Sequence, residues 1–133
     1  MSGRSPGRRL VACALLGLAV AGCDEPYVRE LRRIPSPDGR AEVFVTETNG
    51  GATTDYVYRV FVGVPGATKT AVEVWRADHV DGLGVDWAGE RLLDIRYSKA
   101  RVFSFSNFVR SADLDLYRYV VEVRLRPQSE RAL

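Results

Sequence analysis

Hydrophobic and polar residues alternate with a period of two along most of the chain, the spacing that puts successive side chains on opposite faces of a β-strand. Residues 91–97 show this clearly, because Leu93 and Ile95 fall on one face while Asp94 and Arg96 fall on the other. No long segment follows the 3.6-residue period of an amphipathic helix. The alternation predicts strands over residues 27–34, 41–48, 56–63, 71–76, 85–87, 91–97, 100–109 and 117–126.

Residues that favour tight turns separate these strands. Ser-Pro-Asp-Gly at 36–39 combines a proline that fixes φ with a glycine that accepts positive φ. Val-Pro-Gly at 64–66 and Ala-Gly-Glu at 88–90 predict two more turns. The segments 49–55, 78–84 and 111–115 are expected to be loops or short turns.

Short strands joined by tight turns predict an all-β fold, a small antiparallel sandwich or partial barrel of seven to eight strands. Residues 28–127 are expected to form a single β domain, followed by a polar tail at 128–133. Pro37–Arg40 and Trp87–Glu90 echo one another, and each resembles the turn before an inner strand of a β-propeller blade. Two such units cannot close a propeller ring, so we expect propeller-blade-like hairpins inside a sandwich.

Valines and aromatic residues on the inward faces are expected to form the core. Between 71 and 76, Val72 and Val74 are predicted to face inward, which puts Trp75 on the outer face. Trp75 and Phe108 are therefore the aromatic residues expected to be partly exposed. The other aromatic residues are expected to be mostly core: Tyr56, Tyr58, Phe61, Trp87, Phe103, Phe105, Tyr117 and Tyr119.

The N-terminal segment has the features of a bacterial lipoprotein signal peptide. Three arginines precede an apolar run at 10–21, which is too short to span a membrane. Val-Ala-Gly-Cys at 20–23 comes next and resembles the lipobox of bacterial lipoproteins. The resemblance implies a signal peptide at 1–22, lipid attachment (palmitate among the acyl chains) to Cys23, and a short tether at 23–27. An ordinary signal peptide, an uncleaved anchor and a twin-arginine signal remain alternatives.

A lipidated Cys23 implies a place in the bacterial cell envelope, on its periplasmic or extracellular face. Asp24 resembles the inner-membrane retention signal of enterobacterial lipoproteins and shifts the expectation toward that membrane. The five tether residues reach about 17 Å at full extension, so the domain is expected to lie close to the bilayer.

Removal of the signal peptide changes both charge and cysteine content. The whole chain carries 19 basic and 17 acidic residues, a net charge of +2. Loss of three arginines leaves 16 − 17 = −1, which removes the main support for nucleic-acid binding. Cys13 is lost as well, so Cys23 is the one cysteine of the mature chain and no internal disulfide can form.

Three segments resemble a family of small uncharacterised bacterial proteins, many of them secreted or lipid-anchored. They are Ser-Pro-Asp-Gly at 36–39, Gly-Ala-Thr-Thr-Asp-Tyr at 51–56, and the stretch from Tyr97 to Phe103. The family pattern has Asp-Cys-Gly where this chain has Asn-Gly-Gly at 49–51, so any role of that cysteine does not apply here. The resemblance implies a shared β fold and brings no activity with it.

The loop at 49–55 is the first candidate binding site. Its glycines allow close approach to the backbone, and its amides and hydroxyls are suited to a polar or anionic ligand. The candidate contact residues are Asn49, Thr53, Thr54 and Asp55. The alternative is a purely structural loop in which the threonine hydroxyls bond their own backbone.

His79 is the single histidine of the sequence and has Asp78 and Asp81 as neighbours. Such a group suggests a metal site or an acid–base pair, against the alternative of a solvated loop. Asp113 and Asp115 suggest calcium binding in the same way, but they lack the order of an EF-hand loop, so surface charge is the favoured explanation.

Recognisable catalytic motifs are absent from the sequence: there is no nucleophile elbow, phosphate-binding glycine loop or motif-placed carboxylate pair. The favoured function is a non-enzymatic lipoprotein, without cofactor or metal, that contacts an envelope protein or glycan. One alternative is an envelope hydrolase or metal-dependent enzyme that uses Asp38, Asp55, His79 or Asp81. The other is a structural subunit of a larger complex.

Overall fold

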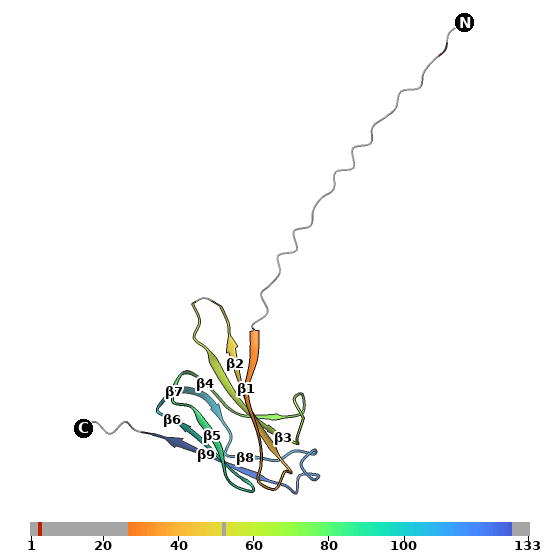
Figure 1. Ribbon diagram of the computed structural model, residues 1–133, viewed down its shortest axis with the longest axis vertical. Helices are drawn as coiled ribbons and strands as arrows, with labels where there is room; N and C mark the ends of the chain where they lie inside the picture. The colour runs from red at the N-terminus through yellow and green to blue at the C-terminus, as the bar shows by residue number, and fades with distance from the viewer. Residues whose placement is uncertain (1–2, 4–26, 52, 129–133) are drawn as a thin grey trace, which may run out of the picture.

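The computed structural model describes residues 3, 27–51 and 53–128, and within them nine strands form two sheets (Figure 1). The first sheet has the order β1-β2-β3-β4-β7 and the second β5-β6-β9-β8. The first sheet contains β1 (Tyr27–Pro35), β2 (Glu42–Asn49), β3 (Val57–Gly63), β4 (Val72–Asp81) and β7 (Lys99–Phe105). The second contains β5 (Gly84–Gly89), β6 (Leu92–Tyr97), β8 (Phe108–Val109) and β9 (Val121–Pro127).

The all-β prediction is confirmed, and the two sheets form a sandwich that does not close into a barrel. Neighbouring strands are antiparallel except β6 and β9, which pair in parallel from Leu92 opposite Glu122 to Tyr97 opposite Pro127. The echoing segments Pro37–Arg40 and Trp87–Glu90 fall at the turns of two hairpins, β1–β2 and β5–β6, which belong to different sheets.

The core lies between the sheets, where β-branched and aromatic side chains meet. Val43, Val60 and Val62 of the first sheet and Leu93 and Ile95 of the second have at most 1% of their surface exposed. Full burial of each such side chain contributes roughly 1.5–3 kcal/mol relative to leaving it in water. Leu93 and Ile95 therefore share the inward face of β6, as their alternation predicts.

Strand β4 differs from its prediction because two irregularities interrupt its alternation. Phe61 pairs with Glu73 and Val60 pairs with Trp75, so the strand is bulged at Val74. The extra residue reverses the facing of the next residues along the strand, and Trp75 is fully buried in the core instead of on the outer face. The strand then continues to Asp81, so the first part of the predicted loop at 78–84 is strand.

Several aromatic residues predicted to be core lie at the surface. Phe103 and Phe105 are 50% and 40% exposed, because β7 is the edge strand of its sheet. Tyr117 is 53% exposed and has a φ of 67°, because it ends a turn and lies before the strand that begins at Val121. Phe108 is 51% exposed, as predicted.

Residues 1–2, 4–26 (Cys23 among them), 52 and 129–133 lie outside the described residues. In the part of the chain that is described, there is no helix both long and apolar enough to cross a membrane.

Candidate functional site

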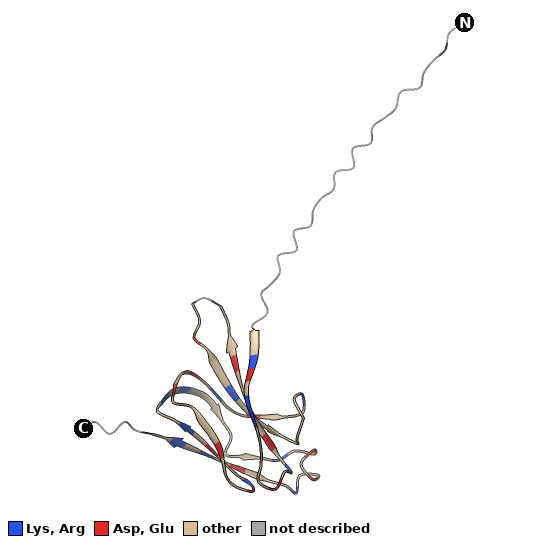
Figure 2. Cartoon of the chain, in the orientation of Figure 1, with Lys and Arg blue, Asp and Glu red and all other residues tan. Residues whose placement is uncertain are grey.

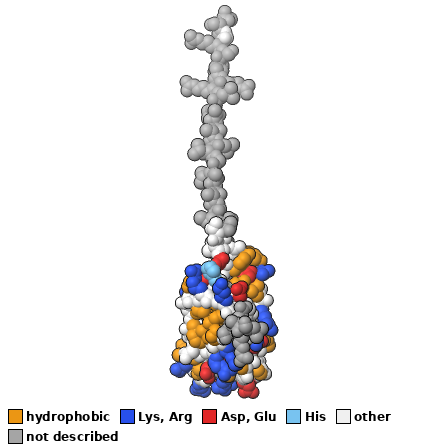
Figure 3. Space-filling model, turned by 90° about the vertical axis from the view of Figure 1, so that its left-hand side faces the viewer, with side chains coloured by type: hydrophobic (Ala, Val, Ile, Leu, Met, Phe, Trp, Pro, Cys, Tyr) orange, Lys and Arg blue, Asp and Glu red, His pale blue; other side chains and the backbone are white. Residues whose placement is uncertain are grey.

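The candidate site lies at the end of the sandwich where β1 begins, which we call the sandwich mouth. It is formed by the β2–β3 loop, the last residues of β4 with the β4–β5 turn that follows, and the first residues of β7. Tyr27 of β1 pairs with Asn49 at the end of β2, so the candidate loop lies beside the start of β1. Figure 3 shows the histidine exposed at this end of the domain, with acidic and basic side chains close to it.

The loop at 49–55 is shaped in part by its own hydrogen bonds. The Gly51 amide donates to Oδ1 of Asn49 at 3.0 Å, and the Thr54 amide donates to the Gly51 carbonyl at 3.2 Å. Gly51 has a φ of 131°, a conformation that other residues rarely adopt. The Asn49 side chain therefore has a structural role, whereas Thr53, Thr54 and Asp55 are exposed to solvent.

His79 joins this loop to strand β4. Its Nε2 atom lies 2.6 Å from Oδ2 of Asp55, and its Nδ1 atom lies 2.9 Å from Oδ1 of Asp78. His79 lies in the second irregularity of β4 and has a φ of 50°. Its side chain therefore does not follow the regular in-and-out alternation of the strand. Each ring nitrogen of His79 lies within hydrogen-bond distance of a carboxylate oxygen, one from the loop and one from β4 itself.

Asp78 continues the series of contacts into the first sheet. Its carboxylate accepts from Nε and Nη2 of Arg101 at 2.8 and 2.5 Å, a two-pronged ion pair across β4 and β7. The guanidinium of Arg101, followed by the hydrogen bond from His79, lowers the pKa of Asp78 to about 2. Asp55, His79, Asp78 and Arg101 form one connected series, which we call the ion-pair chain.

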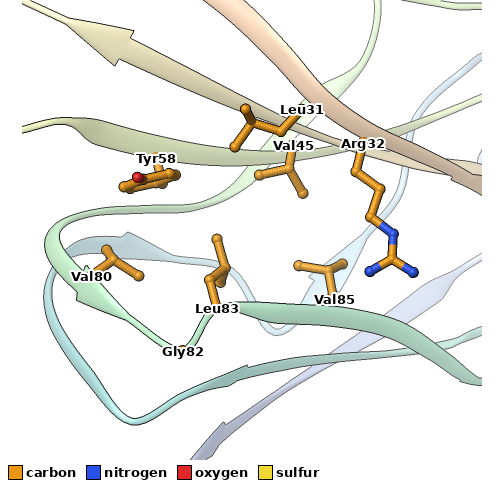
Figure 4. Close-up of a pocket in the computed structure, with 8 residues that line it drawn as sticks. All are labelled: Leu31, Arg32, Val45, Tyr58, Val80, Gly82, Leu83 and Val85. Atoms are coloured by element: carbon orange, nitrogen blue, oxygen red, sulfur yellow. The ribbon is translucent and has the colours of Figure 1, made fainter.

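Two hollows lie in this region, and one of them, the polar hollow, is lined by Asp55 and His79 of the ion-pair chain. The polar hollow has a volume of about 260 Å³, and the apolar hollow, shown in Figure 4, has a volume of about 370 Å³. The polar hollow is lined by Asp55, Tyr56, Tyr58, His79, Val80, Asp81 and Lys99. The apolar hollow is lined by Leu31, Arg32, Val45, Tyr58, Val80, Gly82, Leu83 and Val85.

Tyr58 and Val80 line both hollows, so the two spaces share a wall. The Tyr58 hydroxyl donates to Oε2 of Glu47 at 2.9 Å. Burial, and then this carboxylate, raise the pKa of Tyr58, so its hydroxyl stays a donor. The apolar hollow takes side chains from β1, β2, β3 and β4 of the first sheet and from β5 of the second, so it opens between the layers (Figure 4).

Gly82 is required at the turn beside the apolar hollow. Its φ is 68°, and a Cβ atom there would lie 2.7 Å from Oγ of Ser98. The turn ends β4 and leads into β5 in the opposite sheet, and so sets the position of Leu83 at the rim.

The structure brings together some of the predicted residues and separates others. Asp55, His79 and Asp81 line one hollow, whereas Asp38 lies at the far end of the β1–β2 hairpin and accepts from Tyr119. Asp115 lies in a turn, 3.4 Å from Arg40. Among the described residues, no three or more His, Cys, Asp or Glu side chains are grouped so that they could hold a metal ion.

Sequence reasoning missed Arg101, Lys99 and Tyr58 as site residues. Arg101 reaches Asp78 through the pairing of β4 with β7, more than twenty residues apart in sequence, and no local pattern encodes that contact. Lys99 and Tyr58 come from two further strands. Their only distinguishing feature in the sequence is that they alternate with apolar residues, and this feature does not indicate a site.

Both ring nitrogens of His79 lie next to carboxylate oxygens, one of Asp55 and one of Asp78. A group of one imidazole and two carboxylates can form hydrogen bonds with a polar ligand and can also take part in acid–base chemistry. Comparison with known proteins found no match to the chain among protein-family models, curated proteins or solved structures.

Proposed function

We propose that this protein is a lipid-anchored protein of the bacterial cell envelope, held by lipidated Cys23, whose β-sandwich is a non-enzymatic binding domain. The lipobox-like segment at 20–23 supports the anchor, and the small uncharacterised bacterial family remains the proposed relationship. The sandwich mouth is the proposed binding site.

The observation that carries the binding proposal is the apolar hollow, which shares a wall with the polar hollow. Small-molecule sites are concave and mostly apolar, with a few placed polar groups, and their volumes begin at about 300 Å³. The apolar hollow, about 370 Å³, suits a compact apolar group of a ligand. Asp55, Asp81 and Lys99 stand next to it and suit a polar or zwitterionic end.

The position of the site relative to the proposed anchor supports a membrane or envelope ligand. Strand β1 begins at Tyr27, and the sandwich mouth lies at that same end. Cys23 precedes Tyr27 by four residues, which extend about 14 Å at most. A lipidated Cys23 would keep the mouth within that reach of the bilayer surface, where amphipathic envelope components are concentrated.

Site-specific photo-cross-linking tests the proposal in membranes of the native host. A photoreactive residue at Thr54 or Leu83 lies at the mouth, and one at Lys69, in the exposed β3–β4 connection, is the matched control. We expect a discrete product from the two mouth positions and none from Lys69. Equal labelling from all three positions, or none from the mouth, would contradict the proposal.

An envelope hydrolase or metal-dependent enzyme is the second candidate, favoured by the convergence of Asp55, His79 and Asp81 on the polar hollow. Ester, phosphoester and glycoside substrates, tested with and without added divalent cations, distinguish it from a binding protein. Turnover that disappears in His79→Gln would support the enzyme, and turnover that His79→Gln leaves unchanged would not.

A further inference from the structure

Strand β1 contains a bulge beside the apolar hollow. The register of β1 against β2 shifts between Glu30 and Arg32, so Leu31 is the extra residue. Successive side chains of a regular strand point to opposite faces of a sheet. Leu31 and Arg32 nevertheless both line the apolar hollow, because a bulge re-aims the side chains around it. The bulge thereby brings the guanidinium of Arg32 to a mostly apolar space.

Arg32 differs from the other two arginines of β1 in having no ionic partner within residues 27–51 and 53–128. Figure 2 shows basic positions on either side of an acidic one along β1. Arg29 lies 3.0 Å from Glu47, and Arg33 lies 2.5 Å from Glu42. The side chain of Arg32 is exposed and keeps all its hydrogen-bond donors for a bound anion.

The size and lining of the apolar hollow suit a short aliphatic chain. In Figure 4 the aliphatic side chains form two facing rows, one from β1 and β2 and one from the segment between β4 and β5. The rows consist of Leu31 and Val45, and of Val80, Leu83 and Val85. The volume of about 370 Å³ holds roughly twelve carbon or oxygen atoms, at about 30 Å³ for each water-sized group. A diacyl phospholipid is several times larger than this space.

The two ends of the hollow differ in charge. Figure 4 shows Tyr58 at one end of the rows and Arg32 at the other. The Tyr58 hydroxyl already donates to Glu47. Tyr58 also forms a wall of the polar hollow, where two carboxylates, which repel an anion, stand against one lysine besides His79. An anionic group is therefore expected at the Arg32 end, where a guanidinium can donate two parallel hydrogen bonds to a carboxylate.

We propose that the apolar hollow binds a single-chain amphiphile with an anionic head. Its aliphatic chain lies between the two rows, and its carboxylate binds the guanidinium of Arg32. The proposal rests on the proposed function, because it takes the apolar hollow as the binding site, and it adds the chemical class of the ligand. A carboxylate with a chain of about eight to ten carbons is the simplest member of this class that fits the volume.

Methyl NMR of the full mature chain in phosphatidylcholine nanodiscs tests the proposal, with decanoate as the probe. We expect shift changes at the methyl groups of Leu31, Val45, Leu83 and Val85. Leu116, which is 71% exposed, reports adsorption of the amphiphile elsewhere and should not change. Decanol and decyltrimethylammonium carry the same chain with a neutral and a cationic head, and we expect both to bind about tenfold more weakly.

Variants of Arg32 test the anion contact. Arg32→Gln removes the guanidinium without breaking an ion pair of the described residues. We expect the dissociation constant of decanoate to rise about tenfold, or about 1.4 kcal/mol, and that of decanol to stay within about twofold. Arg110→Gln is the matched control, because Arg110 is exposed and lines neither hollow, and it should change the decanoate value less than about twofold. Equal binding of decanoate to Arg32→Gln and to the unchanged chain would overturn the proposal.

The other outcomes separate this proposal from the proposed function. Shifts of the same methyl groups with decyltrimethylammonium but not with decanoate would overturn the anionic class and leave the hollow as a binding site. The same shifts from phosphatidylglycerol in the nanodisc, without decanoate, would overturn the single-chain class in favour of a lipid of the bilayer. No shift with any amphiphile would overturn the proposal, whereas photo-cross-linking from Thr54 and Leu83 decides the proposed function independently.

Discussion

His79 fastens the β2–β3 loop to strand β4, because its Nε2 atom lies 2.6 Å from Oδ2 of Asp55. The two residues are 24 positions apart in sequence and meet only in the folded chain. Both are about half exposed, so the contact holds a loop in place more than it stabilises the domain.

Replacement of His79 by Ala should release the loop. We expect faster hydrogen exchange of the backbone amides at 53–56, measured by mass spectrometry, and a change of less than about 1 kcal/mol in the free energy of unfolding. Asp113→Asn, which removes an exposed acid elsewhere, is the control and should leave the loop unchanged. Unchanged exchange in His79→Ala would mean that Asp55 does not depend on the histidine for its position.

Acid should destabilise the fold through two carboxylates. The Ser36 hydroxyl and then the Arg40 amide lower the pKa of Asp38 to about 2, and Arg101 and then His79 do the same for Asp78, from an ordinary value of 3.8. Because both pKa values are lower in the folded state, their stabilising contribution is complete above pH 3.8 and is lost as the pH falls toward 2. Urea unfolding between pH 5 and 2 should show this loss, and Asp38→Asn should make the dependence shallower. A parallel curve for Asp38→Asn would contradict the low pKa of Asp38.

Tyr119→Phe should destabilise the domain by about 1–3 kcal/mol. The Tyr119 side chain is buried, and its hydroxyl lies 2.7 Å from Oδ2 of Asp38 and 3.0 Å from the Glu90 carbonyl. It thereby ties the segment before β9 to the β1–β2 turn and to the β5–β6 turn. Chemical denaturation measures the change, and Tyr56→Phe, at a tyrosine 48% exposed, should stay within about 0.5 kcal/mol. Equal losses in the two variants would show that the buried hydroxyl has no special role.

Trp75→Ala should cost about 3–5 kcal/mol in the free energy of unfolding, because the indole is fully buried in the core. Phe108→Ala is the comparison, with a side chain 51% exposed, and should cost about 1 kcal/mol or less. Similar losses in the two variants would contradict the bulge at Val74 that turns Trp75 inward.

Local patterns were enough to predict the regular parts of the fold. The strands around Val43 and Leu93 contain no bulge in their hairpin partners' register at these residues, and the turn at 36–39 has residues typical of a tight turn, so all three can be derived from residues close in sequence. The Gly39 amide donates to the Ser36 carbonyl at 2.9 Å, and Gly39 has a φ of 70°, as such a turn requires.

The rest depended on interactions that a linear pattern does not carry. A single added residue at Val74 reverses the alternation, so Trp75 was assigned to the wrong face. The parallel pairing of β6 with β9 joins segments about thirty residues apart. In the candidate site, the loop residues stay a prediction from the sequence, whereas the contacts of Asp55 with His79 and of Asp78 with Arg101 can be derived only from the fold.

The most direct test of the central proposal is the intact mass of the protein extracted from membranes of a bacterium that processes lipoproteins. We expect a mature chain that begins at Cys23, lacks residues 1–22, and carries the added mass of a diacylglyceryl group with or without a further acyl chain. Cys23→Ser should lose that mass and leave the membrane fraction. A chain that retains residues 1–22, or one that begins at Cys23 without added lipid, would contradict the proposal.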